Sequence, residues 1–372
     1  TSADEQKKWV GSLEAAVQSA AAQAPPRPAT RNKETKKCSG ECGEEKAEDG
    51  QSLACAVAVF NAWLSSQQLP VAKLEAQVVP GMRIGAVATE PIKPEELYLS
   101  VPLRVIMDSN SARRSTPLLE SGVFSKAARS READFFVLLF HLLYEYQVLG
   151  SKSFYWPYLR LLPQLHEIKP PCEYGDEEMK LLEGSEVHRA IRSYKHEVER
   201  HWKMMQSKAD ADFGAEAAAL FGAWEKDGLP EDVFRWAHYV LNSRSIWWNG
   251  ARHLVPLLDL INCKEGPDNP ERVHATRLDS TGQNADTLAP WGFAKGDQVF
   301  ENYGQPNHIY FQYHGFVLDE NTHDCVSLRV EITKDDAEST EGGINAMRRT
   351  MVQNRFNSAQ QSFCVANPLL VQ

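Results

Sequence analysis

Apolar residues are spaced differently in successive parts of the chain. Residues 56–68 carry apolar side chains at helical spacing, and Pro70 ends this pattern. The next segments are short, rich in β-prone residues and broken by Gly or Pro, which indicates a small, strongly turned sheet rather than a parallel α/β sheet; they are residues 78–79, 85–88 and 97–101. Helical spacing then returns over about 110 residues, in residues 132–149, 176–207, 210–224 and 230–243.

Short strands and turns are predicted again beyond this helical block. They fall in residues 253–262, 296–304 and 316–330. The chain therefore combines a β region with a helical insert that interrupts it, which is an α+β arrangement. It contains no internal repeat with a period of about 20 to 50 residues, and this excludes solenoids and propellers.

Residues 1–50 differ in composition from the rest of the chain. An Ala-rich stretch with helical potential is stopped by the Pro-rich run at residues 25–28, and a segment rich in Lys, Glu and Gly follows. This composition favours a flexible tail. Cys38 and Cys42 lie in the tail with three residues between them, but no second pair follows, so we expect no zinc site there.

The overall composition indicates a globular, acidic protein. The 372-residue chain is 42% apolar, enough to bury a sizeable core. Its formal net charge of −10 gives no basic field for a phosphate backbone, so we expect no nucleic-acid binding and a basic protein partner. The longest apolar run, residues 135–144, is about half the roughly 20 residues of a membrane-spanning helix, so we do not expect an integral membrane protein.

The seven cysteines are mostly far apart in the sequence, unlike the disulfide framework of a small secreted module. We therefore expect reduced thiols. The chain begins with Thr1, which is compatible with removal of a targeting segment, so the cytoplasm and an organelle both remain open as its location.

Three separated segments carry a more specific pattern. The first runs from Gly81 through Gly85 to the closing Val-Pro at position 102. The second is Asn242-Ser-Arg followed by Leu-Val-Pro-Leu-Leu-Asp-Leu-Ile-Asn at 254–262, and the third runs from Asn-Tyr-Gly at 302–304 to Asn-Thr-His-Asp at 321–324. In this order they resemble the SET-domain family, in the branch that contains the Rubisco large-subunit lysine methyltransferases and the actin-histidine methyltransferase.

The resemblance covers about residues 51–330 and implies a domain plan. It implies a SET fold of short, mostly antiparallel strands with a pseudo-knot, built from residues 51–110 and 236–330 and interrupted by a helical insert at 111–235. Residues 331–372 are then a short C-terminal extension. The family usually continues into a helical substrate-binding domain, which we expect to be truncated or missing here.

The chemistry implied by the resemblance is methyl transfer from S-adenosylmethionine to a protein side chain. Such an in-line displacement depends on positioning a neutral nitrogen and excluding water. By resemblance Tyr303 is the catalytic tyrosine, with its hydroxyl near the transfer axis, and Gly304 permits a tight crossing of chain segments. The alternative for Tyr303 is an ordinary buried core tyrosine.

The same resemblance assigns cofactor-binding residues. Arg244 pairs with the carboxylate of the cofactor or, alternatively, forms a structural ion pair. Asp259 is either a pocket residue or a turn cap. The remaining cofactor contacts are expected from the backbone of Ile84 and Gly85, from Asn262 and from Cys263. No metal is expected, because the C-x-C-x₄-C cluster of zinc-closed SET sites does not occur.

Several residues depart from the family pattern. Alignment on Gly85 places Met82 and Arg83 where an acidic residue and a glycine are usual, and that glycine position often has φ above zero. Cys263 replaces the usual histidine, which removes an aromatic, hydrogen-bonding ring beside the adenine region. His314 and His323 lie in matching segments, but a satisfied histidine is the simpler interpretation of each.

The substrate pocket is expected to include Ile246, Trp247 and Phe316. The segment after Arg244 is apolar where the histidine-modifying relative is rich in amides, so lysine is favoured over histidine as the modified residue. The sequence therefore predicts an S-adenosylmethionine-dependent protein methyltransferase. The alternative is a SET-like binding or structural subunit of a larger complex that has lost the donor site, and an Arg83 side chain lying across the pocket would favour it.

Overall fold

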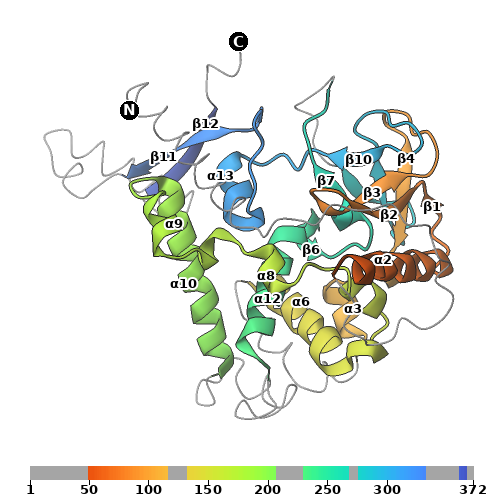
Figure 1. Cartoon of the computed structure of the whole chain (residues 1–372), viewed down its shortest axis with the longest axis horizontal. Coiled ribbons are helices and arrows are strands. Elements are labelled where there is room, and N and C mark those ends of the chain that lie inside the picture. The colour runs from red at the N-terminus through yellow and green to blue at the C-terminus, as the bar shows by residue number, and fades with distance from the viewer. Residues whose placement is uncertain (1–48, 116–131, 207–228, 268–274, 332–359, 367–372) are drawn as a thin grey trace, which may run out of the picture.

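The computed structural model describes residues 49–115, 132–206, 229–267, 275–331 and 360–366. They form an α+β protein in which small sheets lie at one side and helices pack beneath and beside them (Figure 1). Almost all of the predicted tail at residues 1–50 and the predicted helix at 210–224 lie outside the described residues.

Two four-stranded sheets form the β region, with strand orders β1-β4-β9-β8 and β2-β3-β10-β7. In these sheets only β10 and β7 pair in parallel, and the other pairs are antiparallel. Strands from before and after the helical insert are thus neighbours in both sheets. Their bounds are β1 Val71–Ala72, β2 Leu74–Val79, β3 Arg83–Ala88, β4 Leu97–Pro102, β7 Asn262–Cys263, β8 Thr276–Leu278, β9 Asn284–Leu288 and β10 Gln298–Glu301.

Two further antiparallel pairs lie outside these sheets. One is the hairpin of β5 (Ile246–Trp248) and β6 (Ala251–His253), and the other pairs β11 (Cys325–Glu331) with β12 (Gln360–Ala366). The first hairpin directly follows helix α12, so it links the helical insert to the second half of the β region.

The longer helices are α2 (Asp49–Ser66), α6 (Ala133–Leu143), α10 (Glu186–Gln206) and α12 (Glu231–Arg244). Shorter helical segments join them, namely α3 Ser109–Arg113, α7 Trp156–Leu159, α8 Leu165–Ile168, α9 Asp176–Lys180 and α13 Asn307–Ile309, with single turns at Leu103–Val105, Tyr144–Leu149, Gly150–Lys152, Pro171–Glu173, Leu258–Leu260 and Tyr310–His314.

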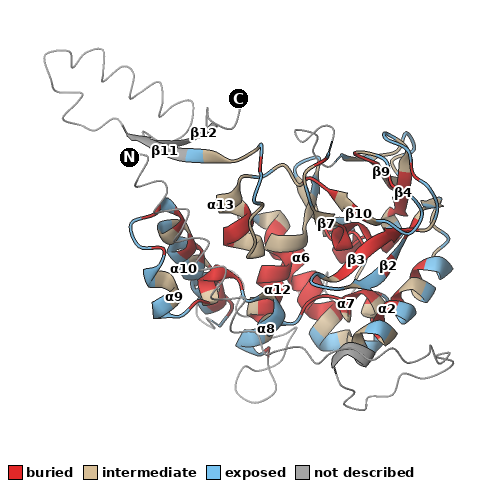
Figure 2. Cartoon of the chain, turned by 45° about the horizontal axis from the view of Figure 1, so that its top comes forward, coloured by how far each residue is buried: buried red, intermediate tan, exposed pale blue. Residues whose placement is uncertain are grey.

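The core lies where α6 and α12 meet the sheets, as the buried segments in Figure 2 show. Every residue of α6 from Phe135 to Leu143 is buried, which explains why this helix is apolar on all sides. Large side chains from both halves of the β region and from the insert contribute to the same core, including Tyr98, Phe140, Tyr158, Phe234 and Phe311.

Two predicted elements differ in the structure. Residues 176–207 are not one helix, because Gly184 adopts a φ of +80° and Ser185 caps α10 by accepting a hydrogen bond from the His188 backbone N–H at 3.0 Å. Of the strands and turns predicted for residues 316–330, the strand is β11 at the end of the segment, and residues 316–324 form turns. The Asn307 side chain accepts from the backbone N–H of Leu318 and donates to its carbonyl, so these groups are not available to a sheet.

The expectation of reduced thiols is wrong for Cys55 and Cys325, each of which is disulfide-bonded, whereas Cys172 and Cys263 are free. Spacing along the chain did not indicate which sulfurs the fold brings together. Among the described residues there is no helix with the length and apolar character that a membrane crossing requires.

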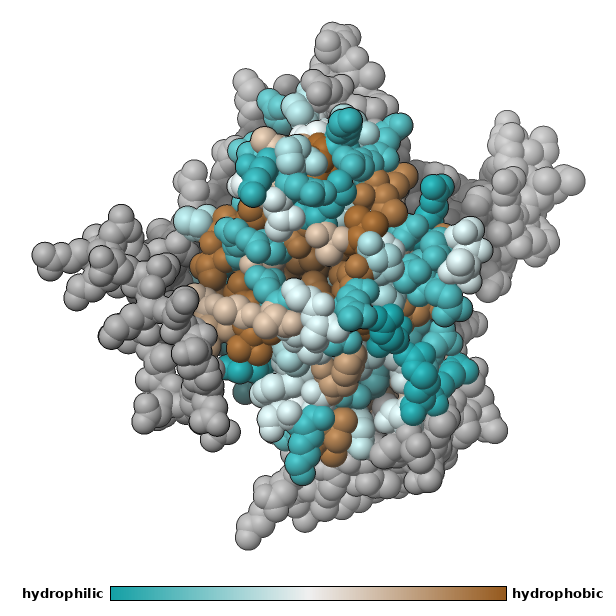
Figure 3. All heavy atoms as spheres, turned by 90° about the vertical axis from the view of Figure 1, so that its right-hand side faces the viewer, coloured by the Kyte–Doolittle hydropathy of each residue, from teal (hydrophilic) through white to brown (hydrophobic). Residues whose placement is uncertain are grey.

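The face formed by α2 and strands β1–β4 presents apolar side chains near its middle, surrounded by polar ones (Figure 3). Exposed apolar residues of these elements include Val59 on α2 and Val78 on β2.

Candidate functional site

The turn after β10 carries Tyr303 and is held by polar side chains. Asn302 is fully buried, and its Oδ1 accepts a hydrogen bond from the Gly304 backbone N–H at 2.8 Å. Gly304 has a φ of +68°, which glycine adopts without steric cost. The Tyr310 hydroxyl accepts a hydrogen bond from the Gln305 backbone N–H at 3.1 Å. These bonds fix the direction in which the Tyr303 side chain leaves the backbone.

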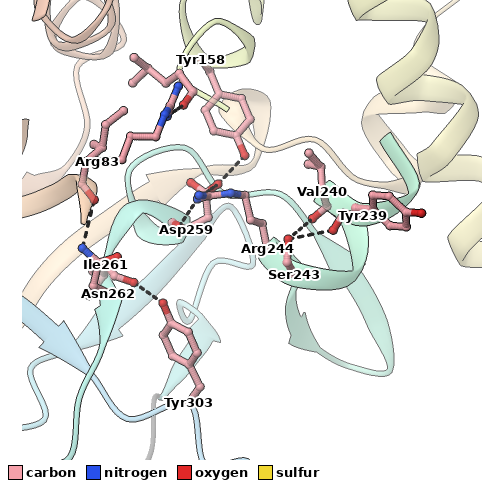
Figure 4. Close-up of polar contacts among 12 residues, drawn as sticks. Arg83, Tyr158, Tyr239, Val240, Ser243, Arg244, Asp259, Ile261, Asn262 and Tyr303 are labelled. Carbon is pink, nitrogen blue, oxygen red and sulfur yellow. Dashed lines mark hydrogen bonds and ion pairs between the residues drawn. The ribbon is translucent and has the colours of Figure 1, made fainter. Parts of the chain in front are cut away.

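The Tyr303 hydroxyl donates a hydrogen bond to the carbonyl of Ile261 at 2.5 Å (Figure 4). This contact links the third sequence segment to the second, 42 residues apart. Burial raises the pKa of Tyr303 well above its ordinary value, so the side chain is a neutral phenol at pH 7. It can orient a polar group, but it is not a ready base.

Asn262 links the second segment to the first. It lies in β7 opposite Phe300 of β10, and its amide donates a hydrogen bond to the Ile84 carbonyl at 3.0 Å. A Cβ at the adjacent Gly85 would lie 2.7 Å from Nε2 of Gln298 and 3.1 Å from Nδ2 of Asn262. A larger residue here would therefore displace the neighbouring side chains, Gln298 first.

Arg244 ends helix α12 and points toward Asp259 (Figure 4). Its Nη1 donates a hydrogen bond to the backbone carbonyl of Asp259 at 2.8 Å and lies 3.6 Å from Oδ2 of the Asp259 carboxylate. Within the described part of the chain, no other hydrogen bond of this guanidinium is found, although the group has five donors. With 23% of the side chain exposed, the remaining donors can reach a ligand.

The Asp259 carboxylate is fully buried and only partly satisfied. Its Oδ2 accepts a hydrogen bond from the Tyr158 hydroxyl at 2.8 Å, whereas Oδ1 has no hydrogen-bond partner among the described residues. Burial raises the pKa of Asp259 to about 6, and the Arg244 charge opposes this shift. The site thus contains an unpaired acceptor that would gain from a donor.

Arg83 occupies the expected glycine position and has a φ of +61°, as that position predicted. Its side chain donates hydrogen bonds to the Leu161 carbonyl at 2.5 Å and to Glu167 Oε1 at 2.8 Å. The side chain is therefore fixed to the segment around α7 and α8, and Figure 4 shows it on the opposite side of the site from Tyr303.

An aromatic cluster surrounds Tyr303. Its ring centroid lies 6.2 Å from that of Tyr310 and 5.9 Å from that of His314. Phe316 completes the cluster by stacking on Tyr310 at 5.0 Å. Burial lowers the pKa of His314 to about 4, so it is a neutral ring at pH 7. Cys263 is half-buried nearby, and burial raises the pKa of its thiol, which makes it a poor nucleophile.

The other two predicted pocket residues lie on the β5–β6 hairpin. Ile246 is partly buried against the core, but Trp247 is 54% exposed. The Arg252 guanidinium lies 4.5 Å from the Trp247 ring and 4.9 Å from the Phe135 ring. In the described residues no ring contact joins Trp247 to the cluster around Tyr303, so the structure groups Phe316 with Tyr303 and leaves Trp247 apart.

Sequence reasoning missed two members of this site. Tyr158 was not singled out as a site residue, yet it is the hydrogen-bond partner of Asp259. Tyr310 was not singled out, yet its hydroxyl supports the turn that carries Tyr303. The Trp-Pro-Tyr sequence at 156–158 was the available signal for Tyr158, but a partner 101 residues away could not be read from it.

Comparisons with known proteins give relatives in sequence and in structure, although no family model matches the chain. It is 28% identical over 292 residues to the actin-histidine N-methyltransferase of Rhinolophus ferrumequinum, covering 74% of this chain and 44% of that protein. It is also 28% identical over 268 residues to that of Gallus gallus, covering 68% of this chain and 41% of that protein. The chain therefore spans less than half the length of these curated relatives.

Solved structures with the same fold include the SET domain of LSMT bound to lysine and AdoHcy, with a TM-score of 0.68, 22% identity, and coverage of 85% of this chain and 68% of that chain. Rubisco LSMT bound to AdoMet gives a TM-score of 0.66 and 20% identity, with coverage of 84% and 67%. These likenesses establish the fold of the present chain, including its helical insert between two β regions.

Proposed function

We propose that this SET-domain protein, of the branch that contains Rubisco LSMT and the actin-histidine methyltransferases, transfers a methyl group from S-adenosylmethionine to a lysine of a protein substrate. One observation carries the proposal. The three sequence segments converge through direct bonds, Asn262 to Ile84 and Tyr303 to Ile261, beside a guanidinium that has donors left over.

The residues at this place fit the cofactor. The spare donors of Arg244 suit a carboxylate, for which guanidinium geometry allows bidentate binding. Gly85 lacks a Cβ, so the side chains of Gln298 and Asn262 can lie close to its backbone and hold this strand against β7 and β10. Asp259 is fully buried, so its part is to hold the Arg244 guanidinium in place through its backbone carbonyl and its carboxylate.

S-adenosylmethionine supplies an electrophilic methyl group on a sulfonium. The protein then has to position the nucleophile against this methyl group and to exclude water. Tyr303 is a neutral phenol whose hydroxyl is already held by a backbone carbonyl, so little reorganisation is needed for it to orient a nucleophile. The surrounding rings of Tyr310 and Phe316 provide an apolar wall that keeps a neutral amine dry.

Lysine is favoured over histidine by the apolar character of the hairpin that follows Arg244. Ile246 packs against the core and offers no hydrogen-bonding side chain to orient an imidazole. An aromatic cluster next to Tyr303 instead suits the alkyl chain of a lysine. The preference rests on shape and polarity, so it is tested separately from cofactor binding.

The competing hypothesis is an inactive SET-like subunit. Cys263 at the usual histidine position is the observation that favours it, because a half-buried thiol replaces a ring that could contact adenine. The direction of Arg83 weighs against it. Its guanidinium is bonded to Leu161 and Glu167 rather than spanning the space between Arg244 and Tyr303.

Isothermal titration of the full chain with S-adenosylmethionine and with its demethylated product tests the donor site. We expect micromolar binding, and Arg244→Ala should weaken it by about 10- to 100-fold because a charge-assisted hydrogen bond contributes roughly 1.5–3 kcal/mol. Arg189→Ala, on the exposed part of α10, is the matched control and should bind like the wild type. No binding by folded wild-type protein would reject the proposal in favour of the subunit.

Methyl transfer is then measured with radiolabelled S-adenosylmethionine on peptide arrays in which lysine or histidine is the only nucleophile. We expect label on lysine peptides and a strong loss of transfer in Tyr303→Phe, with cofactor affinity changed little. Label confined to histidine peptides would show that the inference from Ile246 is wrong while leaving methyl transfer intact.

A further inference from the structure

A buried cluster of three metal-ligating side chains lies between α10 and α12, which pack against each other (Figure 1). Glu197 and His201 are one helical turn apart on α10 and so share a face. His238 projects from α12. One potential ligand atom from each of these three residues lies within 4.8 Å of the other two. Both histidines are completely buried, and Glu197 is half-buried.

The two imidazoles are already spaced as ligands of one ion. Nδ1 of His201 lies 3.2 Å from Nε2 of His238. Two nitrogens bound to a tetrahedral zinc ion at about 2.0–2.1 Å are separated by roughly 3.3–3.4 Å. Only a small displacement of the rings would place a zinc ion between them.

The outer nitrogens have the partners that orient metal-bound histidines. Nε2 of His201 lies 3.2 Å from Oε2 of Glu132, and Nδ1 of His238 lies 3.3 Å from the Tyr194 hydroxyl. A carboxylate or hydroxyl on the far nitrogen fixes the tautomer and directs the near lone pair toward a metal. Two donors also approach these outer nitrogens, the Arg200 guanidinium at 2.8 Å from Nε2 of His201 and the Asn242 amide nitrogen at 3.1 Å from Nδ1 of His238. Metal binding therefore requires these two groups to turn away, so that the outer nitrogens carry the proton.

The charges around the cluster leave room for a cation. In the described part of the chain, the Glu197 carboxylate has no hydrogen bond or ion pair, and burial raises its pKa. Arg252 also acts on the cluster and would oppose a cation, while Glu132 and Asp134 offset its charge.

We propose that Glu197, His201 and His238 bind a divalent transition-metal ion, with zinc the best fit and water as the fourth ligand. Two imidazoles and one carboxylate form a donor set that suits zinc. The sequence predicted no metal, and these residues form no recognisable motif because His238 is 37 residues from His201. The ion would join α10 to α12 across the insert.

The proposed site lies close to the end of α12 that carries Arg244. The Asn242 amide lies 3.1 Å from Nδ1 of His238 and donates to the Tyr194 hydroxyl at 3.0 Å. Tyr194 in turn packs on Tyr313 at 5.0 Å. Zinc would therefore brace the helix end from which Arg244 emerges. The metal site does not depend on the proposed methyl transfer, because it is detected by metal binding alone.

The test uses the full chain, stripped of metal with a chelator and then titrated with zinc in competition with a chromophoric indicator. Cobalt is titrated in parallel, because tetrahedral cobalt gives intense visible absorption. We expect one strongly bound ion per chain, tetrahedral cobalt bands, and a higher melting temperature with zinc. Glu197→Gln and His201→Asn should each weaken binding at least tenfold.

The controls separate this site from adventitious ones. His196→Gln, an exposed histidine on the same helix, should bind zinc like the wild type. Circular dichroism must show that Glu197→Gln is folded, and this variant keeps the test decisive if His201→Asn unfolds. Binding that survives both substitutions, or cobalt spectra with sulfur charge-transfer bands, would assign the metal to cysteines and overturn the proposal. Absence of tight binding by folded wild type would overturn it as well.

Discussion

Asp259 should make the stability of this protein depend on pH in a way that one substitution removes. Its carboxylate is fully buried, and only one of its oxygens accepts a hydrogen bond from a described side chain, that of Tyr158. Burial raises the pKa of Asp259 to about 6 from an ordinary value of 3.8. The folded state therefore binds the proton more tightly than the unfolded state. The stabilisation is present at low pH and is lost as pH rises through about 6.

The size of the effect follows from the two pKa values. At pH 5 the folded carboxyl is about 10:1 protonated, while the unfolded one is nearly all ionised, which corresponds to a free energy of about 1 kcal/mol. At pH 8 both are ionised and the contribution is close to zero. Asp259→Asn cannot titrate, so the unfolding free energy of wild type relative to this variant should fall by about 1 kcal/mol between pH 5 and pH 8.

Urea unfolding of wild type and Asp259→Asn at pH 5 and pH 8 measures this change. The contributions of other titrating groups are common to both proteins, so they largely cancel in the comparison. Tyr158→Phe provides a second test of the Asp259 pKa. It removes a donor to the ionised carboxylate, so the transition should move to higher pH. An identical pH dependence for wild type and Asp259→Asn would refute the reasoning from burial.

Three further predictions concern stability. His141 is 1% exposed and neither ring nitrogen has a hydrogen-bond partner among the described residues, although Nδ1 lies 3.8 Å from Glu145 Oε1; His141→Leu should therefore raise the unfolding free energy in urea by about 1 kcal/mol, and a decrease would point to a stabilising contact with Glu145. Gly85→Ala should cost about 1–3 kcal/mol and weaken cofactor binding, because its Cβ would lie 2.7 Å from a neighbouring amide nitrogen. Gly292→Ala, with a nearest contact of 3.5 Å, is the control and should melt close to wild type. Arg83 has a φ of +61°, so Arg83→Gly should be more stable than Arg83→Ala by about 1 kcal/mol in thermal or urea unfolding, and the reverse order would contradict the strain argument.

The helices and strands that formed as expected are those whose sequence signal is local. Apolar spacing predicted α2 and α12, and β-prone runs predicted β3 and β4, because side chains on one face of an element repeat with its own period. Arg83 stands where the family usually has a glycine, and its φ is positive, as expected for that position. This could be predicted because turn geometry depends on a few consecutive residues.

Local signals failed where a distant side chain decided the outcome. Strands and turns were predicted for residues 316–330 without a boundary between them; β11 begins only at Cys325, because Asn307 takes the backbone groups of Leu318 that a strand would use. The disulfides at Cys55 and Cys325 were missed for a related reason, since spacing in sequence does not report proximity in space.

The sequence by itself determined the kind of protein this is. The order of the three segments, the helical insert between the first and second, and residues such as Tyr303 and Arg244 indicated a SET fold before any coordinate was known. Only the tertiary structure decided which groups meet. It paired Tyr158 with Asp259 and brought His201 to His238, because contacts between elements depend on how the chain crosses itself and on which buried polar atoms must find partners.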